Sequence, residues 1–242
     1  MICRVIYDDR VTIATGKPTL VDEVHAAVYQ DLIDGKLEPG SKLKLSDIAG
    51  QFGVSVAVVR EALSRLSEQG LVQSNPQRGF IVTPLSVHDL LDLTRTRVLI
   101  ETLALRESIR HGDLTWEGQV LATHHALDRT PMVIGERANS AWVEAHRRFH
   151  HAILDGSGVR RLSDIARGLR DCSELYQFWS YTRGHDLDRD ILSEHREIAD
   201  RSLARDEDGA AAALTQHIER TTALLVAYLN RAGLDPGSTI PA

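Results

Sequence analysis

Apolar side chains recur with the 3.6-residue period of an amphipathic helix in three segments near the start of the chain. The first segment begins at Leu20 and is ended by Gly35. In the second, shorter segment Ser46 is the expected N-cap, and Gly53 breaks the chain after it. Ser55 then caps a third helix. The apolar positions of the three predicted helices are Val21, Val24, Val28, Leu32 and Ile33; Ile48, Ala49 and Phe52; and Val58, Val59, Ala62, Leu63 and Leu66.

Two short β-prone runs follow the third helix, which Gly70 ends. The runs are residues 71–74 and 80–83, and the turn residues 75–79 join them as a hairpin. The first 83 residues therefore predict the order helix, helix, turn, helix, hairpin.

After this hairpin the pattern is helical to the end of the chain. Gly, Pro and charged breaks separate six predicted helices, near residues 86–110, 115–128, 138–155, 159–182, 188–205 and 208–232. The predicted fold class is mainly α, with three helices plus a β-hairpin followed by an all-α bundle of about six helices. The corresponding parts are an arm over 1–18, a first domain over 19–83, a linker over 84–86, a second domain over 87–232 and a tail over 233–242.

Composition excludes several classes of protein. Of 242 residues, 43% are hydrophobic and 26% are charged, enough apolar surface to bury a core and exclude general disorder. Cys3 and Cys172 form no CxxC pair, which argues against a disulfide framework and a Cys-based zinc finger. Asp8 and Asp9 interrupt any signal peptide, and no run approaches the roughly 18 apolar residues of a membrane span. We therefore expect a cytoplasmic protein with no membrane partner.

The net charge of −6 does not by itself suggest binding to nucleic acid. Residues 1–83 contain 9 Lys and Arg against 10 Asp and Glu, a balance of −1, and the remainder contains 19 against 24, a balance of −5. A DNA-binding function must therefore rest on a local patch and a motif.

The first 83 residues contain the parts of a winged helix-turn-helix. Gly53 permits a tight turn between two short helices, and the hairpin supplies the wing with Arg78 at its tip. In such a unit the N-terminus of the second short helix enters the major groove. The alternative is a small helical packing unit without a DNA role.

This region resembles the N-terminal domain of GntR transcription regulators. The resemblance covers residues 19–83 almost without a gap. It is carried by Gly35-Lys36-Leu37-Glu38-Pro39-Gly40, Asp47-Ile48-Ala49, Phe52-Gly53-Val54-Ser55, Val59-Arg60-Glu61-Ala62-Leu63-Ser64-Arg65-Leu66, Gly70-Leu71-Val72 and Arg78-Gly79-Phe80.

The chain departs from that family where DNA is contacted. Val56-Ala57-Val58 replaces the usual Arg-Thr-Pro after the serine, and Ser46 stands where some members carry a DNA-contacting arginine. Val56 can offer only apolar contact, for instance to a thymine methyl. The resemblance implies a homodimer on double-stranded DNA with a short inverted repeat. The expected DNA-contacting residues are Ser46, Ser55, Val56, Ala57, Arg60, Arg65, Arg78 and Gly79.

Four histidines in the helical region have spacings that suggest one site. His146 and His150 are four apart and share a helix face. His195 and His217 are 22 residues apart, and residue 206, where a helix break is predicted, lies midway between them. If the two flanking helices fold back antiparallel, the histidines lie side by side on adjacent helices. Two such pairs are compatible with one four-ligand metal site inside a bundle. The alternative is four unrelated histidines that cap or pack helices.

The helical region resembles the FCD ligand-binding domain of the FadR subfamily of GntR regulators, in its shorter VanR-like branch. The matching residues are Arg97, Ile100 and Glu101; Phe149-His150 and Ser157-Gly158; and Glu194-His195 and His217. Metal-binding members supply an Asp, a His four residues later and two further His. His146 stands at the Asp position, so the resemblance implies four imidazoles, a set that favours a divalent ion such as Zn²⁺ or Ni²⁺ over harder cations.

Arg97 is the candidate for binding an effector carboxylate, since guanidinium suits bidentate pairing. The alternative is a structural ion pair with Glu101, one turn further on. The leading hypothesis is thus a ligand-responsive regulator, with repression as the expected direction and a small organic acid as the effector. The alternatives are a metal sensor, a regulator without metal, and a metalloenzyme. The last is disfavoured because the chain has no HExxH motif and no clearly placed general base.

Overall fold

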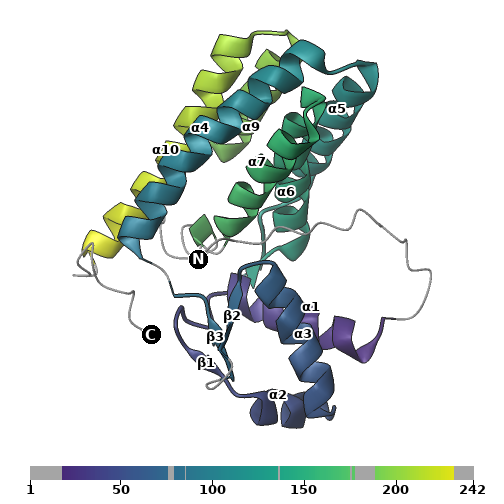
Figure 1. Ribbon diagram of the computed structural model, residues 1–242, viewed down its shortest axis with the longest axis vertical. Helices are drawn as coiled ribbons and strands as arrows, with labels where there is room; N and C mark the ends of the chain where they lie inside the picture. Colours follow the sequence, from purple (N-terminus) through teal and green to yellow (C-terminus); the bar gives the residue numbers. More distant parts are fainter. Residues whose placement is uncertain are drawn as a thin grey trace.

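The computed structural model describes residues 18–75, 79–84, 86–135, 137–174, 176–177 and 189–231. A small unit of three helices and a sheet lies at one end, and an elongated helical bundle lies next to it (Figure 1). This arrangement confirms the predicted fold class. No helix among the described residues is both long and apolar enough to cross a membrane.

The three helices of the N-terminal unit are α1 (Leu20–Ile33), α2 (Leu45–Phe52) and α3 (Val56–Glu68). Thr19 starts α1 in a capping box with Asp22. Ser55 caps α3 as predicted, accepting a hydrogen bond from the Val58 N–H at 3.4 Å. The predicted cap of α2 is wrong: Lys44 occupies the N-cap position, and the Ser46 hydroxyl instead bonds the Asp47 carboxylate at 3.0 Å.

The reason for the earlier start of α2 is a strand that the sequence pattern did not reveal. β1 (Lys42–Leu43) pairs with β3 (Gly79–Val82), which also pairs with β2 (Val72–Asn75), giving the antiparallel order β1-β3-β2. Lys44 leaves β1 in an extended conformation and leads directly into the helix. The predicted hairpin is confirmed, with each strand displaced by one residue.

The core of this unit consists of apolar positions from the predicted helices α1 and α3 and from the two β-prone runs. They pack between α1, α3 and the sheet, and their side chains are almost fully buried. The members are Val24, Val28, Leu32, Ile33, Val59, Ala62, Leu63, Leu66, Leu71, Val72, Phe80 and Val82.

The bundle contains six helices with defined bounds among the described residues. These are α4 (Val87–His111), α5 (Leu114–Arg129), α6 (Ser140–Leu154), α7 (Arg160–Cys172), α9 (Ile191–Leu203) and α10 (Glu207–Arg231). The longest two, α4 and α10, lie side by side (Figure 1). Two small elements were not predicted: a hairpin of β4 (Val133–Ile134) and β5 (Arg137–Ala138), and a 3₁₀ turn, η1 (Asp155–Ser157).

One predicted helix is shorter than expected. The helix predicted over 159–182 ends at Cys172, where Ser173 turns the chain and its N–H bonds the carbonyls of Arg170 and Asp171. Residues 174, 176 and 177 are helical again, and 178–188 lie outside the described residues. The predicted break near residue 206 is confirmed, with Arg205 in the left-handed conformation between α9 and α10.

The two units also contact each other. The Gln30 side chain on α1 donates to the carbonyl of Ala138 at 3.1 Å. The Tyr176 hydroxyl bonds the Asp89 carboxylate at 2.8 Å and the Ser86 carbonyl at 3.3 Å, which fixes the start of α4. The N-terminal unit is therefore connected to the bundle by side-chain hydrogen bonds as well as by the covalent link between β3 and α4.

Candidate functional site

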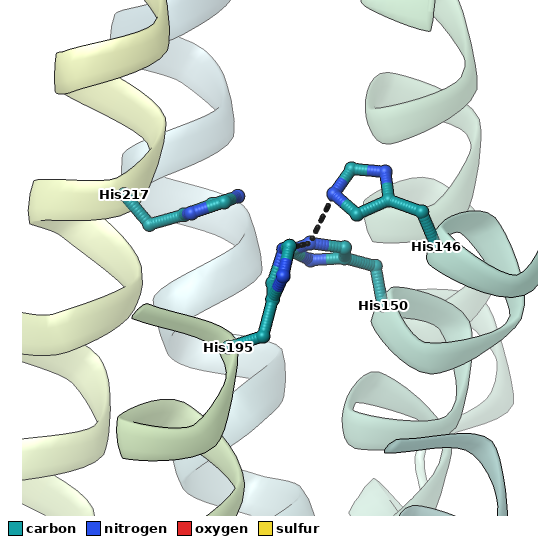
Figure 2. Close-up of side chains that lie close together, drawn as sticks. All are labelled: His146, His150, His195 and His217. Carbon is teal, nitrogen blue, oxygen red and sulfur yellow. Dashed lines mark hydrogen bonds between the residues drawn. The ribbon is translucent and has the colours of Figure 1, made fainter. Parts of the chain in front are cut away.

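The four predicted histidines lie together in the centre of the bundle (Figure 2). His146 and His150 come from α6, His195 from α9 and His217 from α10. All four side chains are at least 95% buried, and one nitrogen of each lies within 4.8 Å of those of the others. The helix spacing and the hairpin midpoint thus predicted a real juxtaposition.

The distances within this histidine cluster suit a small cation. His150 Nε2 lies 3.2 Å from His146 Nε2 and 3.4 Å from His195 Nε2 (Figure 2). Two nitrogens bound tetrahedrally to one zinc at about 2.0–2.1 Å are about 3.3 Å apart. The Nδ1 atoms of His150 and His195 are buried and find no hydrogen-bond partner among the described residues. The hydrogen bonds of the described residues therefore leave this cluster incompletely satisfied, and the arrangement is compatible with a metal ion.

Burial keeps these imidazoles neutral. Loss of hydration lowers the pKa of His146, His150 and His195 well below the usual value. It also lowers the pKa of His217 to about 4, against the opposing effect of Glu194. A neutral imidazole is the form that binds metal, so no proton has to be displaced near neutral pH.

His217 has the outer hydrogen bond that is usual for a metal ligand. Its Nδ1–H donates to Glu194 Oε2 at 2.8 Å, which leaves Nε2 free to face the cluster. Arg189 donates to the same carboxylate at 2.7 and 3.0 Å. Burial would raise the pKa of Glu194, but the hydrogen bonds from His217 and Arg189 outweigh it and lower the pKa to about 2. The role of Glu194 was missed, although it and His217 are also equidistant from the α9–α10 turn.

His146 has a different neighbour, which sequence reasoning also missed. The Arg170 guanidinium on α7 lies 2.8 Å from His146 Nδ1, and the Trp142 ring stacks on the imidazole at 4.8 Å. Arg170 is only 1% exposed. The available signal was periodicity, because Arg170 falls on the inner face of α7 with Ser163 and Ala166.

Arg97 forms the ion pair that was one of its two predicted roles. Its Nε lies 2.6 Å from Glu101 Oε1, and the two side chains are 6% and 0% exposed. Arg97 also borders a small cavity of about 10 Å³, room for about one water molecule, between α4, α10 and the residues after α7. Polar groups around this cavity include Thr94, Gln177 and Thr221, the last one turn from His217 on α10.

The candidate DNA-contacting residues of α2 and α3 are exposed. Ser46, Ser55, Ala57 and Arg60 are exposed, and Val56 is 45% exposed. The N-terminus of α3 is therefore accessible for insertion into a groove.

Arg65 differs from that expectation. It pairs with Asp22 at 3.0 Å and with Glu61 at 2.8 Å, so its charge is partly neutralised within the protein. Gly79 begins β3 with a φ of 83°, a conformation that favours glycine. Arg78 lies outside the described residues.

Comparison with known proteins gives the same division of the chain. Residues 20–82 match the family model of bacterial regulatory proteins of the gntR family, and residues 92–220 match the FCD domain. The solved structure of McbR/YncC from E. coli shares the fold, with a TM-score of 0.66 and 20% identity over 87% of this chain and 99% of that one. A GntR family regulator from Pseudomonas syringae gives a TM-score of 0.51 at 24% identity, over 90% and 91% of the two chains.

Two curated relatives are more similar in sequence. The uncharacterized HTH-type transcriptional regulator BphR of Paraburkholderia xenovorans is 33% identical over 210 residues, 86% of this chain and 85% of its own. The HTH-type transcriptional repressor GlaR of Escherichia coli is 30% identical over 192 residues, 78% and 87% of the two chains. The protein described here is therefore a DNA-binding transcriptional regulator of the GntR family with a C-terminal FCD domain, and not an enzyme.

Proposed function

We propose that this protein is a cytoplasmic repressor whose affinity for DNA is set by a small carboxylate that binds beside a metal ion in the bundle. The observation that carries the proposal is the buried histidine cluster within an FCD domain that is attached to an exposed recognition helix. The repressors GlaR and RspR of E. coli are relatives at 30% and 24% identity, which supports repression as the direction.

The proposed DNA reader is the N-terminus of α3. Ser55, Val56, Ala57 and Arg60 are its exposed residues, and Ser46, Arg65, Arg78 and Gly79 complete the proposed contact set. Arg60 makes no ion pair with any described residue, so its charge is available to a phosphate or a base. Arg65 contributes less in this proposal because it is already paired with two carboxylates.

The proposed metal is Zn²⁺ or Ni²⁺, held by nitrogen atoms of the histidine cluster. Neutral imidazoles suit these borderline ions, and the cluster offers no carboxylate oxygen that would favour a harder cation. When bound, the ion would supply a positive charge and a coordination position for an anion. Glu194 would hold the His217 ring in the orientation that presents Nε2 to it.

The proposed effector site is the metal position itself, and the small cavity beside Arg97, with room for about one water molecule, lies next to it. Arg97 and Arg189 are paired with Glu101 and Glu194. The Arg170 guanidinium, in contrast, lies 2.8 Å from His146 and places positive charge beside the cluster, which favours a small organic acid. Such an acid changes DNA affinity only if it binds two arrangements of the protein with different strength.

The proposed assembly is a homodimer that binds a short inverted repeat. An apolar groove of about 440 Å³ runs between α4 and α10 on the bundle surface, and Leu99 in it is 63% exposed. A contiguous apolar surface of this kind is typical of an interface, and a second copy of the chain is the proposed occupant. The apolar side chains that line it are Leu91, Val98, Leu99, Ala223 and Val226.

The domain limits in this proposal are 19–83 for the DNA-binding domain and 87–232 for the effector domain. The arm (1–18), the linker (84–86) and the tail (233–242) complete the chain. The assignment to the shorter, VanR-like branch is part of the same proposal.

A metal-sensing regulator is the second candidate function. It is favoured if all four imidazoles bind the ion, because a closed tetrahedral shell leaves no position for an effector. In that case free Zn²⁺ or Ni²⁺ alone would change DNA affinity, and the ion would exchange with a chelator on the time scale of the response.

Elemental analysis of the purified full-length protein tests the proposal. About one Zn²⁺ or Ni²⁺ per chain is expected in the wild type after incubation with either ion, and its loss is expected in His150→Ala. DNA duplexes selected from a random pool then serve as probes for titration with a panel of small carboxylates. Absence of metal from the loaded wild type would refute the metal site, and carboxylates without effect would refute the effector class.

A further inference from the structure

The outer hydrogen bonds of His217 and His146 have opposite polarity. His217 Nδ1 lies 2.8 Å from the Glu194 carboxylate, which only accepts, and 3.4 Å from the Arg189 guanidinium, which only donates. The shorter contact places the proton on Nδ1, so Nε2 has a free lone pair. His146 Nδ1 faces the Arg170 guanidinium at 2.8 Å, and a guanidinium only donates. His146 Nδ1 must therefore be the acceptor. In a neutral imidazole the single proton then resides on Nε2, the nitrogen that faces the cluster.

A protonated ring nitrogen has no lone pair to offer a metal. His146 could bind the ion through Nε2 only by becoming an imidazolate or by giving up the hydrogen bond from Arg170. The second change would remove an acceptor from a charged group that is 99% buried, which is costly. The ring is also held by Trp142, which stacks on it with an interplanar angle of 11°.

We propose that the metal is held by His150, His195 and His217 alone, and that His146 donates a hydrogen bond from Nε2 to an oxygen anion in the remaining coordination position. This inference rests on the proposed metal site and defines how that site recognises its ligand. Without such an anion, the His146 Nε2–H has an acceptor in His150 Nε2 at 3.2 Å. Once His150 Nε2 binds the ion, it can no longer accept this hydrogen bond. The His146 Nε2–H is then available to the ligand in the remaining coordination position.

The ligand class follows from the charges. Arg170 is buried against His146, so its positive charge polarises the imidazole and makes the Nε2–H a stronger donor. A metal bound by three neutral histidines keeps its charge of +2, and an anion in the fourth position reduces it. The ligand that fits both groups is a carboxylate, with one oxygen on the metal and available to the His146 N–H.

The sequence departure at this position thus changes the chemistry of the site. An aspartate here would supply a negatively charged metal ligand, whereas His146 together with Arg170 supplies a donor and positive charge. A three-histidine site leaves a coordination position open, as a site that must bind a ligand requires.

The test compares His146→Ala and His146→Gln with His150→Ala in the full-length protein. Zinc content and zinc affinity, measured by competition with a chromophoric chelator, are expected to stay within about tenfold of wild type in both His146 variants. His150→Ala is expected to lose zinc. Acetate affinity, followed by the visible spectrum of the Co²⁺-loaded protein, is expected to fall about 10- to 100-fold in His146→Ala.

A second measurement does not depend on a substitution. Long-range ¹H–¹⁵N spectra of histidine-labelled wild type are expected to show His146 protonated on Nε2 with and without Zn²⁺, while the Nε2 signals of the other three shift on loading. Zinc loss in His146→Ala equal to that in His150→Ala, or a zinc-shifted His146 Nε2, would overturn the inference and leave the four-ligand site standing. Absence of zinc from the loaded wild type would instead overturn the proposed metal site itself.

Discussion

Breaking the buried ion pair between Arg97 and Glu101 is expected to destabilise the bundle strongly. The two side chains are one turn apart on α4, 2.6 Å from each other, and 6% and 0% exposed. Arg97→Met leaves the Glu101 carboxylate buried without its partner, and Glu101→Leu leaves the Arg97 guanidinium buried without its carboxylate. Removal of one member of a buried pair costs about 3–5 kcal/mol. That is a large share of the roughly 5–15 kcal/mol that holds a typical domain together.

The double variant Arg97→Met/Glu101→Leu separates the interaction energy of the pair from the interactions of each side chain with the rest of the protein. Replacing both charges by apolar groups of similar volume removes the buried charge altogether, so most of the loss is expected to return. Because each single variant is expected to cost about 3–5 kcal/mol and the double variant little, the cycle should give a coupling free energy of at least about 5 kcal/mol between the two positions. Arg106→Met on the same helix is the control, because Arg106 pairs with Asp208 at the surface and should cost under about 1 kcal/mol.

Urea unfolding followed by tryptophan fluorescence measures these changes. All three tryptophans follow residue 115, and Trp116 and Trp142 are buried in the bundle, so the signal reports the helical region alone. Every sample carries a chelator, so that metal binding does not shift the apparent stability. If Arg97→Met unfolds within about 1 kcal/mol of wild type but no longer binds the carboxylate effector, the reasoning fails and Arg97 is a ligand-binding residue.

Three further predictions follow from the same geometry. Glu194→Gln should weaken zinc binding about 10- to 100-fold in chelator competition, whereas Glu197→Gln on the exposed side of α9 should not. Burial raises the pKa of Glu174 from 4.5 to about 7. The folded wild type therefore keeps this carboxyl neutral at pH 4, and its unfolding free energy falls as the pH rises from about 4.5 through 7. The unfolding free energy of Glu174→Gln relative to wild type should therefore rise by about 3 kcal/mol between pH 4 and 8, and a flat difference would contradict the buried carboxyl. Arg60→Ala should lower the salt dependence of DNA binding by about one ion, measured by fluorescence anisotropy, and a larger loss in Arg65→Ala would reverse their proposed order.

The elements that could be predicted are those governed by a regular period. The apolar stripe of α3 and the serine before it fixed that helix, and the midpoint at residue 206 placed His195 beside His217. Both depend only on helix geometry and on a tight turn. The strand β1 could not be predicted, because two residues are too short to show alternation and Lys42–Leu43 pairs with a segment almost forty residues away.

The parts of the site that escaped prediction are side chains brought in by tertiary packing. Arg170 reaches His146 only because α7 packs against α6, and nothing in its local sequence marks it as a neighbour of a histidine. The end of α7 was missed for a similar reason, since no Gly or Pro occurs in the eleven residues after Cys172 and the turn at Ser173 is held by backbone hydrogen bonds. Long-range contacts of this kind determine which nitrogen of His146 carries its proton.

Because α4 is attached directly to the wing, a small tilt of this helix produces a larger displacement of the N-terminal unit. Only residues 83–86 separate the end of β3 from the start of α4; Thr83 bonds to Gly70 and Leu71 on one side, and Tyr176 holds Ser86 on the other. At 25 residues α4 is about 37 Å long, so a tilt of about 5° about one end moves the other by about 3 Å. In the proposed homodimer the two half-sites on DNA lie about 34 Å apart, and a displacement of this size in each copy would spoil the fit of both recognition helices at once. On that proposal, a small rearrangement around Arg97 in the middle of α4 would be enough to release the DNA.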